Sequence, residues 1–108
     1  MGDRISIQFK DGAEELSPVL FSHWDGENIL IKVKYYCDEL YQYSRANGGI
    51  SPLSRMEAQT VMVDFIRWLT EGKGRVNSNY YLGRDKNDGD NSDNGHHIWN
   101  LYTAGWES

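Results

Sequence analysis

The apolar residues of this chain change their spacing at the stretch Ser22–Gly26, which reads Ser-His-Trp-Asp-Gly. Before it, Ile5, Ile7 and Phe9 alternate with polar residues, which is the period of a half-buried strand. After it, apolar residues recur every three or four positions, which is the period of an amphipathic helix. The stretch is therefore predicted to be a corner that joins a strand to a helix.

Two strands are predicted before the corner. The first covers Arg4–Phe9, and Lys10-Asp11-Gly12 supplies residues that favour a turn. Ser17–Ser22 is the second strand, with Pro18 at its start. Because the link between them is short, we expect the two strands to pair antiparallel.

The first predicted helix runs from Asn28 to about Arg45, and Asn47-Gly48-Gly49 ends it. Its apolar stripe comprises Ile29, Leu30, Val33, Tyr36, Cys37, Leu40, Tyr41 and Ser44.

A second helix is predicted to open at Ser51-Pro52, or a few residues later where Ser54 and Glu57 have the spacing of a capping box. Its stripe comprises Ala58, Val61, Met62, Phe65, Ile66 and Leu69, and Gly72-Lys73-Gly74 ends it.

Two more strands are expected near the C-terminus, Asn79–Gly83 and His96–Tyr102. Residues 84–95 between them are rich in Asp, Asn and Gly, and residues 85–95 are interpreted as a flexible acidic loop. Trp106 is expected either to pack back on the sheet or to lie in a frayed tail.

The element order is thus ββααββ in a single α+β domain spanning residues 1–108. The predicted architecture is a four-stranded antiparallel sheet with both helices packed on one face. The other sheet face would then expose aromatic rings, which favours an oligomer or a partner there.

Composition narrows the classes of function. The formal net charge is −5 and no basic residues cluster, so the chain is expected not to bind nucleic acid. No apolar run approaches 18 residues, which predicts no membrane span. The single cysteine, Cys37, falls on a helical stripe and fits a reducing compartment, so a cytoplasmic location is expected.

Aromatic residues make up 13% of the chain, more than so small a core needs, and Tyr and Trp dominate the energetics of protein interfaces. We therefore expect a protein partner or self-association, for example a dimer. The candidate partner-binding residues are Trp24, Tyr81, Trp99 and Tyr102. The identity of any small-molecule ligand is open.

A metal site is the alternative hypothesis. His23 and Asp25, together with His96 or His97, would supply two imidazoles and a carboxylate to a divalent metal in a metal-binding protein or small metal-dependent enzyme. On a strand, His96 and His97 point to opposite faces, so one of them at most joins such a site. Asp90 opens a stretch like the start of a calcium loop, but Leu101 stands where that loop needs a glutamate.

No catalytic residue is predicted, because the chain has no Gly-rich phosphate loop and no Ser-centred nucleophile elbow. Cys37 and His23 are the one nucleophile–base pair to consider, and Cys37 lies on an apolar stripe. We therefore expect a non-enzymatic protein. In the corner, Trp24 is expected to anchor the turn to the core, Asp25 to cap the helix and Gly26 to permit the bend.

The corner also carries a resemblance. A hairpin formed by Ile5–Phe9 and Leu20–Ser22, followed by His23-Trp24-Asp25-Gly26 and a helix, resembles a group of small uncharacterised proteins found in phages, prophages and some archaeal and bacterial genomes. Tyr81-Leu82-Gly83 and Asp88-Gly89-Asp90-Asn91 resemble the group's C-terminal hairpin. The resemblance implies a small intracellular protein of mobile-element origin, and it assigns no activity and no catalytic residue.

Overall fold

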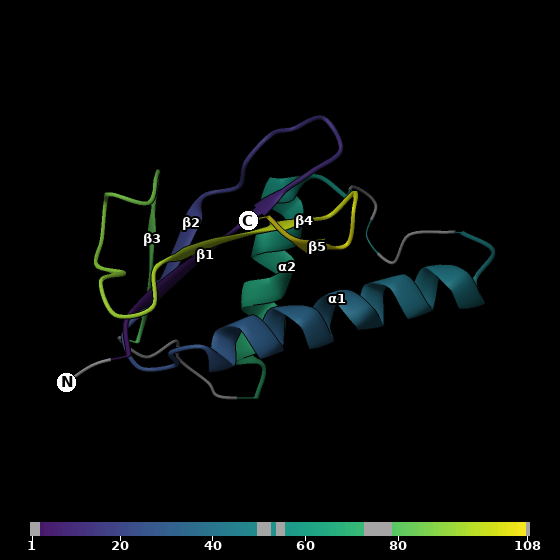
Figure 1. The fold of residues 1–108 in the computed structure, drawn as a ribbon. Coiled ribbons are helices and arrows are strands. Elements are labelled where there is room, and N and C mark those ends of the chain that lie inside the picture. The colour runs from purple at the N-terminus through teal and green to yellow at the C-terminus, as the bar shows by residue number, and fades with distance from the viewer. Residues whose placement is uncertain (1–2, 50–52, 54–55, 73–78, 108) are drawn as a thin grey trace.

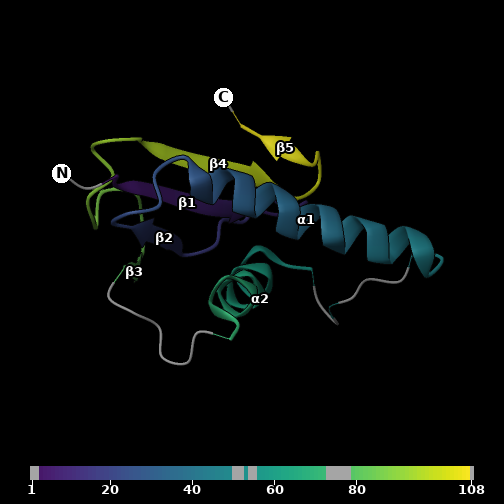
Figure 2. The same ribbon diagram turned by 90° about the horizontal axis from the view of Figure 1, so that it is seen from below.

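The computed structural model describes residues 3–49, 53, 56–72 and 79–107. In chain order the elements are β1 (Ile5–Lys10), β2 (Val19–Ser22), α1 (Asn28–Ala46), α2 (Ala58–Thr70), β3 (Tyr80–Gly83), β4 (His96–Asn100) and β5 (Gly105–Trp106). Both helices are present, and α1 projects past the end of the sheet (Figures 1 and 2). The α+β class and the four expected strands are confirmed.

The sheet is mixed and has five strands in the order β3-β2-β1-β4-β5, so the prediction of four antiparallel strands is wrong in detail. β1 and β2 pair antiparallel as expected, with Ile7 opposite Leu20. β4, however, pairs parallel with β1 along its whole length. β1 is buried on both faces, so it takes a central place, and β4 occupies its free edge.

β3 and β4 are therefore not the two arms of a hairpin, although they follow each other in the chain. Two strands separate them in the sheet, and residues 84–95 carry the chain across from one edge to the other side of β1. β5 is the additional strand: Trp106 pairs with Trp99, so the C-terminal segment packs back on the sheet.

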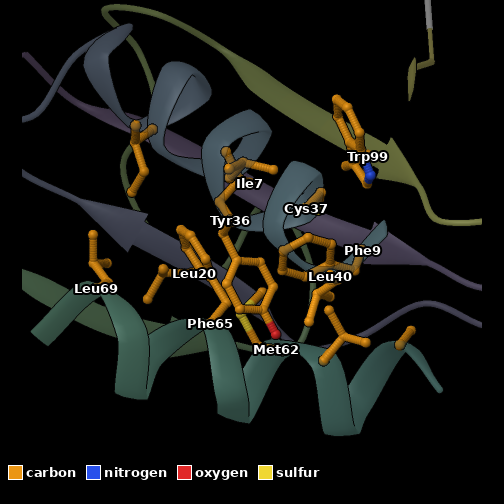
Figure 3. Packing of buried hydrophobic residues seen from close by; sticks show 14 of the residues in the cluster. Ile7, Phe9, Leu20, Tyr36, Cys37, Leu40, Met62, Phe65, Leu69 and Trp99 are labelled. Carbon is orange, nitrogen blue, oxygen red and sulfur yellow. The ribbon is translucent and has the colours of Figure 1, made fainter. Parts of the chain in front are cut away.

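One apolar core joins both helices to one sheet face. Ile5, Ile7 and Phe9 of β1 point into it, as their alternation predicts. Figure 3 shows Tyr36 and Leu40 of α1 and Met62, Phe65 and Leu69 of α2 gathered around Ile7 and Phe9. This helix-covered face also carries Leu20 and Trp99.

The two helix starts use different chemistry from the one expected. Glu27 is the N-cap of α1 and makes no side-chain cap hydrogen bond, so the prediction that Asp25 caps this helix is wrong. For α2, Glu57 is the N-cap, and its amide donates to Thr60 Oγ1 at 3.1 Å. The proposed openings at Ser51-Pro52 and Ser54 lie outside the described residues.

Asp11, in the β1–β2 connection, is buried beside the start of α2. Its Oδ2 accepts the amide of Ala58 at 3.0 Å, and its Oδ1 accepts the amides of Ala13 and Glu15 at 3.0 and 3.1 Å. These donors, the Ala58 amide foremost, hold the pKa of Asp11 below its usual value against the effect of burial. Asp11 therefore ties the hairpin to the second helix.

The second sheet face carries Ser6, Gln8, Phe21, His96 and Ile98, and it is not the bare aromatic surface that was expected. Phe21 is fully buried, and its ring lies parallel to that of Tyr81 with centroids 4.9 Å apart. The loop of residues 84–95 folds back over this face. A Cβ on Gly89 would stand 2.8 Å from Phe21 Cδ1 and 2.6 Å from the Tyr81 hydroxyl, so the loop backbone lies directly on the two rings.

Within the part of the chain that the structure describes, neither helix combines the length and the apolar character needed to cross a membrane.

Candidate functional site

The corner at residues 22–26 is held by residues distant in the sequence. Asn79, just before β3, accepts the amides of His23 and Trp24 on its Oδ1 at 3.0 and 2.9 Å. Gly26 has a positive φ of 54°, as its proposed role in the bend requires, and its amide donates to the carbonyl of Asp3 at 2.9 Å. The backbone of the corner is therefore fixed from both sides.

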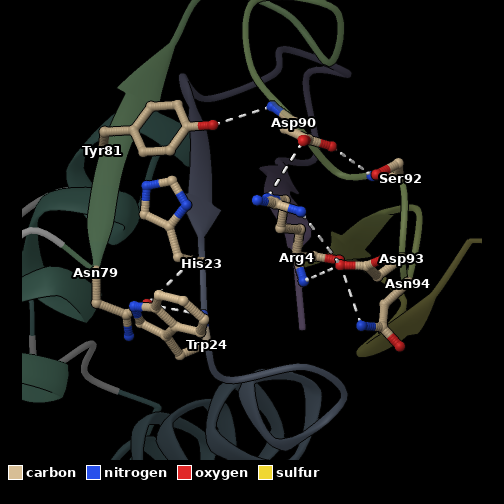
Figure 4. A network of polar contacts seen from close by, with 9 residues as sticks. All are labelled: Arg4, His23, Trp24, Asn79, Tyr81, Asp90, Ser92, Asp93 and Asn94. Carbon is tan, nitrogen blue, oxygen red and sulfur yellow. Dashed lines mark hydrogen bonds and ion pairs between the residues drawn. The ribbon is translucent and has the colours of Figure 1, made fainter. Parts of the chain in front are cut away.

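Trp24 stands on this corner with 63% of its surface exposed, so the prediction that it anchors the turn to the core is wrong. The ring of His23 lies 6.2 Å from it, centroid to centroid. Figure 4 shows the indole at the edge of the cluster, with His23 between Trp24 and Tyr81. A large aromatic side chain is thus displayed on a fixed backbone.

Tyr81 connects the corner to the loop of residues 84–95. Its ring lies 5.1 Å from that of His23 and stacks on buried Phe21. Its hydroxyl oxygen accepts the amide of Asp90 at 2.9 Å. The ring row Trp24–His23–Tyr81 therefore rests on the second face of the sheet, and we refer to these three residues as the corner patch.

The neighbouring side of the loop is acidic around a single arginine. Arg4 Nε lies 3.2 Å from Asp90 Oδ2, and Arg4 Nη1 lies 3.8 Å from Asp93 Oδ2 (Figure 4). The amide of Ser92 donates to Asp90 Oδ1, and this bond, helped by the charge of Arg4, lowers the pKa of Asp90. Asp90 is therefore an anion that is already bonded within the protein.

Asp25 also serves an internal contact. Its Oδ2 accepts the hydroxyl of Tyr80 at 2.6 Å, and Lys32 Nζ lies 3.6 Å from its Oδ1. Burial, followed by this hydrogen bond, raises the pKa of Tyr80. Asp25 thus joins the corner to β3 and, through Lys32, to the N-terminal part of α1.

The other two candidate partner-binding residues lie elsewhere. Trp99 is only 3% exposed, and its indole Nε1 donates to the Tyr41 hydroxyl at 3.3 Å, so its burial excludes it from a partner surface. Tyr102 is 82% exposed in the turn between β4 and β5, beside Gly12.

The residues of the metal hypothesis are not gathered. His96 uses both ring nitrogens within the sheet, toward Ser6 and Gln8. His97 is on the helix-covered face, where its Nε2 lies 2.7 Å from the carbonyl oxygen of Asn94. Among the described residues, no group of three or more His, Cys, Asp or Glu side chains is arranged to hold a metal ion.

Cys37 is fully buried in the core, and burial raises the pKa of its thiol to about 12, so this thiol is protonated at neutral pH. Its proposed pairing with His23, considered above, therefore has no chemical basis.

Sequence reasoning missed Asn79 and Arg4, which organise the corner and the loop. Asn79 and Arg4 each stand immediately before a strand, so each resembles an ordinary flanking residue. Their roles depend on contacts across 55 and 89 positions of the chain, for which no local pattern exists.

Comparisons with known proteins add no family: no family model, curated protein or solved structure matches this chain. The likeness of the corner to small phage and prophage proteins stays a prediction.

Proposed function

We propose that this chain is a non-enzymatic protein-binding module whose partner docks on the corner patch of Trp24, His23 and Tyr81. The observation that carries the proposal is the contrast at Trp24. Its backbone amide is bonded to Asn79 at 2.9 Å, while 63% of the residue is exposed.

This arrangement favours association for a physical reason. Binding costs conformational freedom wherever the contact surface must first become ordered. Asn79 already fixes the backbone at Trp24, and Tyr81 is held between Phe21 and the amide of Asp90. Trp and Tyr are also the side chains that contribute most when they are buried in an interface.

The charge around the patch indicates the kind of partner. Asp90 and Asp93 lie beside it with Arg4 as their counter-ion, and the chain as a whole carries −5. A partner that contributes lysine or arginine side chains would gain favourable long-range attraction here. We therefore propose a partner protein with a basic contact surface, and a second copy of this acidic chain is the less favoured occupant.

Two measurements test the proposal together. Sedimentation at several concentrations reports self-association, and the immobilised chain is used to retain proteins from a host lysate. Trp24→Ala is expected to abolish retention or dimerisation, because it removes the exposed indole. Val63→Ala, at a 70% exposed position on α2, is the matched control and is expected to bind like wild type.

The proposal fails if the chain is monomeric at all concentrations and retains no protein. It also fails at this site if Trp24→Ala and Val63→Ala bind equally well.

We also propose a cytoplasmic setting. The support is the reduced, buried thiol of Cys37, which needs no oxidising compartment to be stable. Origin in a mobile genetic element is proposed on the corner motif alone.

A further inference from the structure

A groove of about 380 Å³ lies on the second face of the sheet, away from the corner patch's exposed indole. Gln8, His96 and Ile98 of β1 and β4 form its floor. Leu16 stands on one wall, and Arg84 and Lys86 of the 84–95 loop stand on the other. Its volume is in the range of small-ligand sites.

The floor is built by a chain of hydrogen bonds with one consistent direction. Gln8 Nε2 donates to the carbonyl of Ser17 at 2.7 Å, so Gln8 Oε1 faces His96 Nε2 at 3.0 Å and requires a proton on that nitrogen. His96 Nδ1 then accepts from Ser6 Oγ at 2.7 Å, and Asn91 Nδ2 donates to the same oxygen at 2.9 Å. The imidazole is therefore neutral and oriented.

Protonation of His96 would disrupt this chain, because a proton on Nδ1 leaves the Ser6 hydroxyl hydrogen without its acceptor. Burial, and after it the positive charge of Lys86 and a smaller effect of His97, also lowers the pKa of His96. The charge of Lys86 thus reaches the floor of the groove.

The wall that lines the groove carries two cations, Arg84 and Lys86, and one carboxylate, Asp85. The Arg84 side chain is 95% exposed, and its Nε lies 3.6 Å from Asp88 Oδ2, so Asp88 offsets part of its charge. Among the described residues, Lys86 makes no ion pair with a carboxylate. Asp85, the acid beside them, has its Oδ1 bonded to the amide of Asn87 at 2.8 Å.

We propose that this groove binds a small organic anion, with its carboxylate or phosphate group between Arg84 and Lys86 and its apolar part against Leu16 and Ile98. Guanidinium and ammonium groups recognise these two anionic groups through charge-assisted hydrogen bonds. The site is separate from the corner patch and does not depend on the function proposed above.

NMR titration of the full chain with inorganic phosphate and, separately, with butyrate tests the proposal. Both probes are expected to shift the amides of residues 84–86 and the ring signals of His96. Saturating anion is also expected to raise the pKa of His96, since a nearby negative charge favours the imidazolium. Tighter binding of butyrate supports the apolar contact.

The double variant Arg84→Gln/Lys86→Met is expected to weaken binding by about tenfold or more, because two charge-assisted contacts are removed. Lys34→Met is the control, a lysine on α1 whose side chain is 62% exposed, and it is expected to leave binding unchanged.

The proposal is overturned if neither probe shifts these signals up to about 10 mM, which corresponds to negligible affinity. It is equally overturned if the double variant and Lys34→Met bind alike, which would mark non-specific attraction. Binding of phosphate without butyrate would overturn the apolar half of the assignment.

Discussion

The two faces of the central sheet are closed by different chemistry. On the helix-covered face, Ile5, Ile7 and Phe9 pack against apolar side chains of α1 and α2. On the second face, polar residues of the same strand, Ser6 and Gln8, are buried in a hydrogen-bonded chain, and a loop rather than a helix covers Phe21.

The helix-covered face mainly stabilises the fold, whereas the second face positions the proposed binding surfaces. Packing on the helix-covered face follows from apolar area and stabilises the fold in proportion to that area. The structure of the second face depends on a few specific contacts. Gly89 lies against the side chains of Phe21 and Tyr81, and His96 is hydrogen-bonded at both ring nitrogens. These contacts place the loop and the corner, which carry the proposed binding surfaces.

The largest expected effect is on the helix-covered face. Phe65 is fully buried, with its ring 5.6 Å from Phe9 and 5.3 Å from Tyr36. Phe65→Ala should lower the free energy of unfolding by about 3–5 kcal/mol through lost burial and a cavity. Urea denaturation measures it. A loss below that of the second-face variant Gly89→Ala would reverse the proposed order of the two faces.

Gly89→Ala tests whether the loop closes the second face. The added Cβ would meet the rings of Tyr81 and Phe21 at 2.6–2.8 Å, so we expect a loss of about 1–3 kcal/mol in the free energy of unfolding. Gly105→Ala is the control, because nothing lies within 4 Å of its added Cβ. Equal stability of the two variants in urea would mean that the loop does not rest on these rings.

Asp11→Ala probes the polar contact that joins the hairpin to α2. Three backbone amides lose their acceptor, and the expected loss is about 1–2 kcal/mol, as for a helix cap. Asp38→Ala removes an exposed carboxylate that lies 3.4 Å from Lys34 Nζ, and it should change the free energy of unfolding little. Similar unfolding curves for the two variants would show that the Asp11 contacts carry no stability.

The pH dependence of stability tests whether neutral His96 stabilises the fold. Its pKa is lowered in the folded chain, so the unfolded chain binds more protons once the pH falls below about 6.5. Stability from this residue is complete above that pH and is lost as the pH falls toward the folded pKa. Urea midpoints at pH 7.5 and 5.5 should therefore differ less in His96→Gln than in wild type. Identical pH dependence of stability in His96→Gln and wild type would contradict the account.

The sequence predicts the helix-covered face well, because that face follows local periodicity. The alternation of Ile5, Ile7 and Phe9 and the stripe through Val61 and Phe65 identify buried positions correctly. Periodicity cannot reveal that β4 pairs parallel with β1, since any exposed strand edge offers the same backbone groups.

The corner between strand and helix lies where the sequence predicts it, but its side chains are arranged differently. Gly26 bends the chain as expected, whereas Trp24 is exposed and Asp25 binds Tyr80 instead of capping a helix. A tryptophan beside an apolar strand is ordinarily interpreted as core, and its 63% exposure in the folded chain shows otherwise. The corner at Ser22–Gly26 thus becomes a support for an exposed ring.

The smallest expected effect is that of Trp24→Ala on stability. Because the residue is 63% exposed, the free energy of unfolding should change by no more than about 0.5 kcal/mol. Urea denaturation checks this value beside Trp99→Ala, which removes a buried indole and should cost several times more. If Trp24→Ala lowered the free energy of unfolding as much as Trp99→Ala does, Trp24 would have to be part of the core.

Hydrogen exchange at the corner tests most directly that a fixed backbone displays Trp24. The amides of His23 and Trp24 should exchange slowly, because both are bonded to Asn79 Oδ1, while the indole N–H of Trp24 should exchange at nearly the rate of a free indole. Rapid exchange of both amides would show that the corner is not fixed, and a protected indole would show that Trp24 is not displayed. Either result would contradict the account.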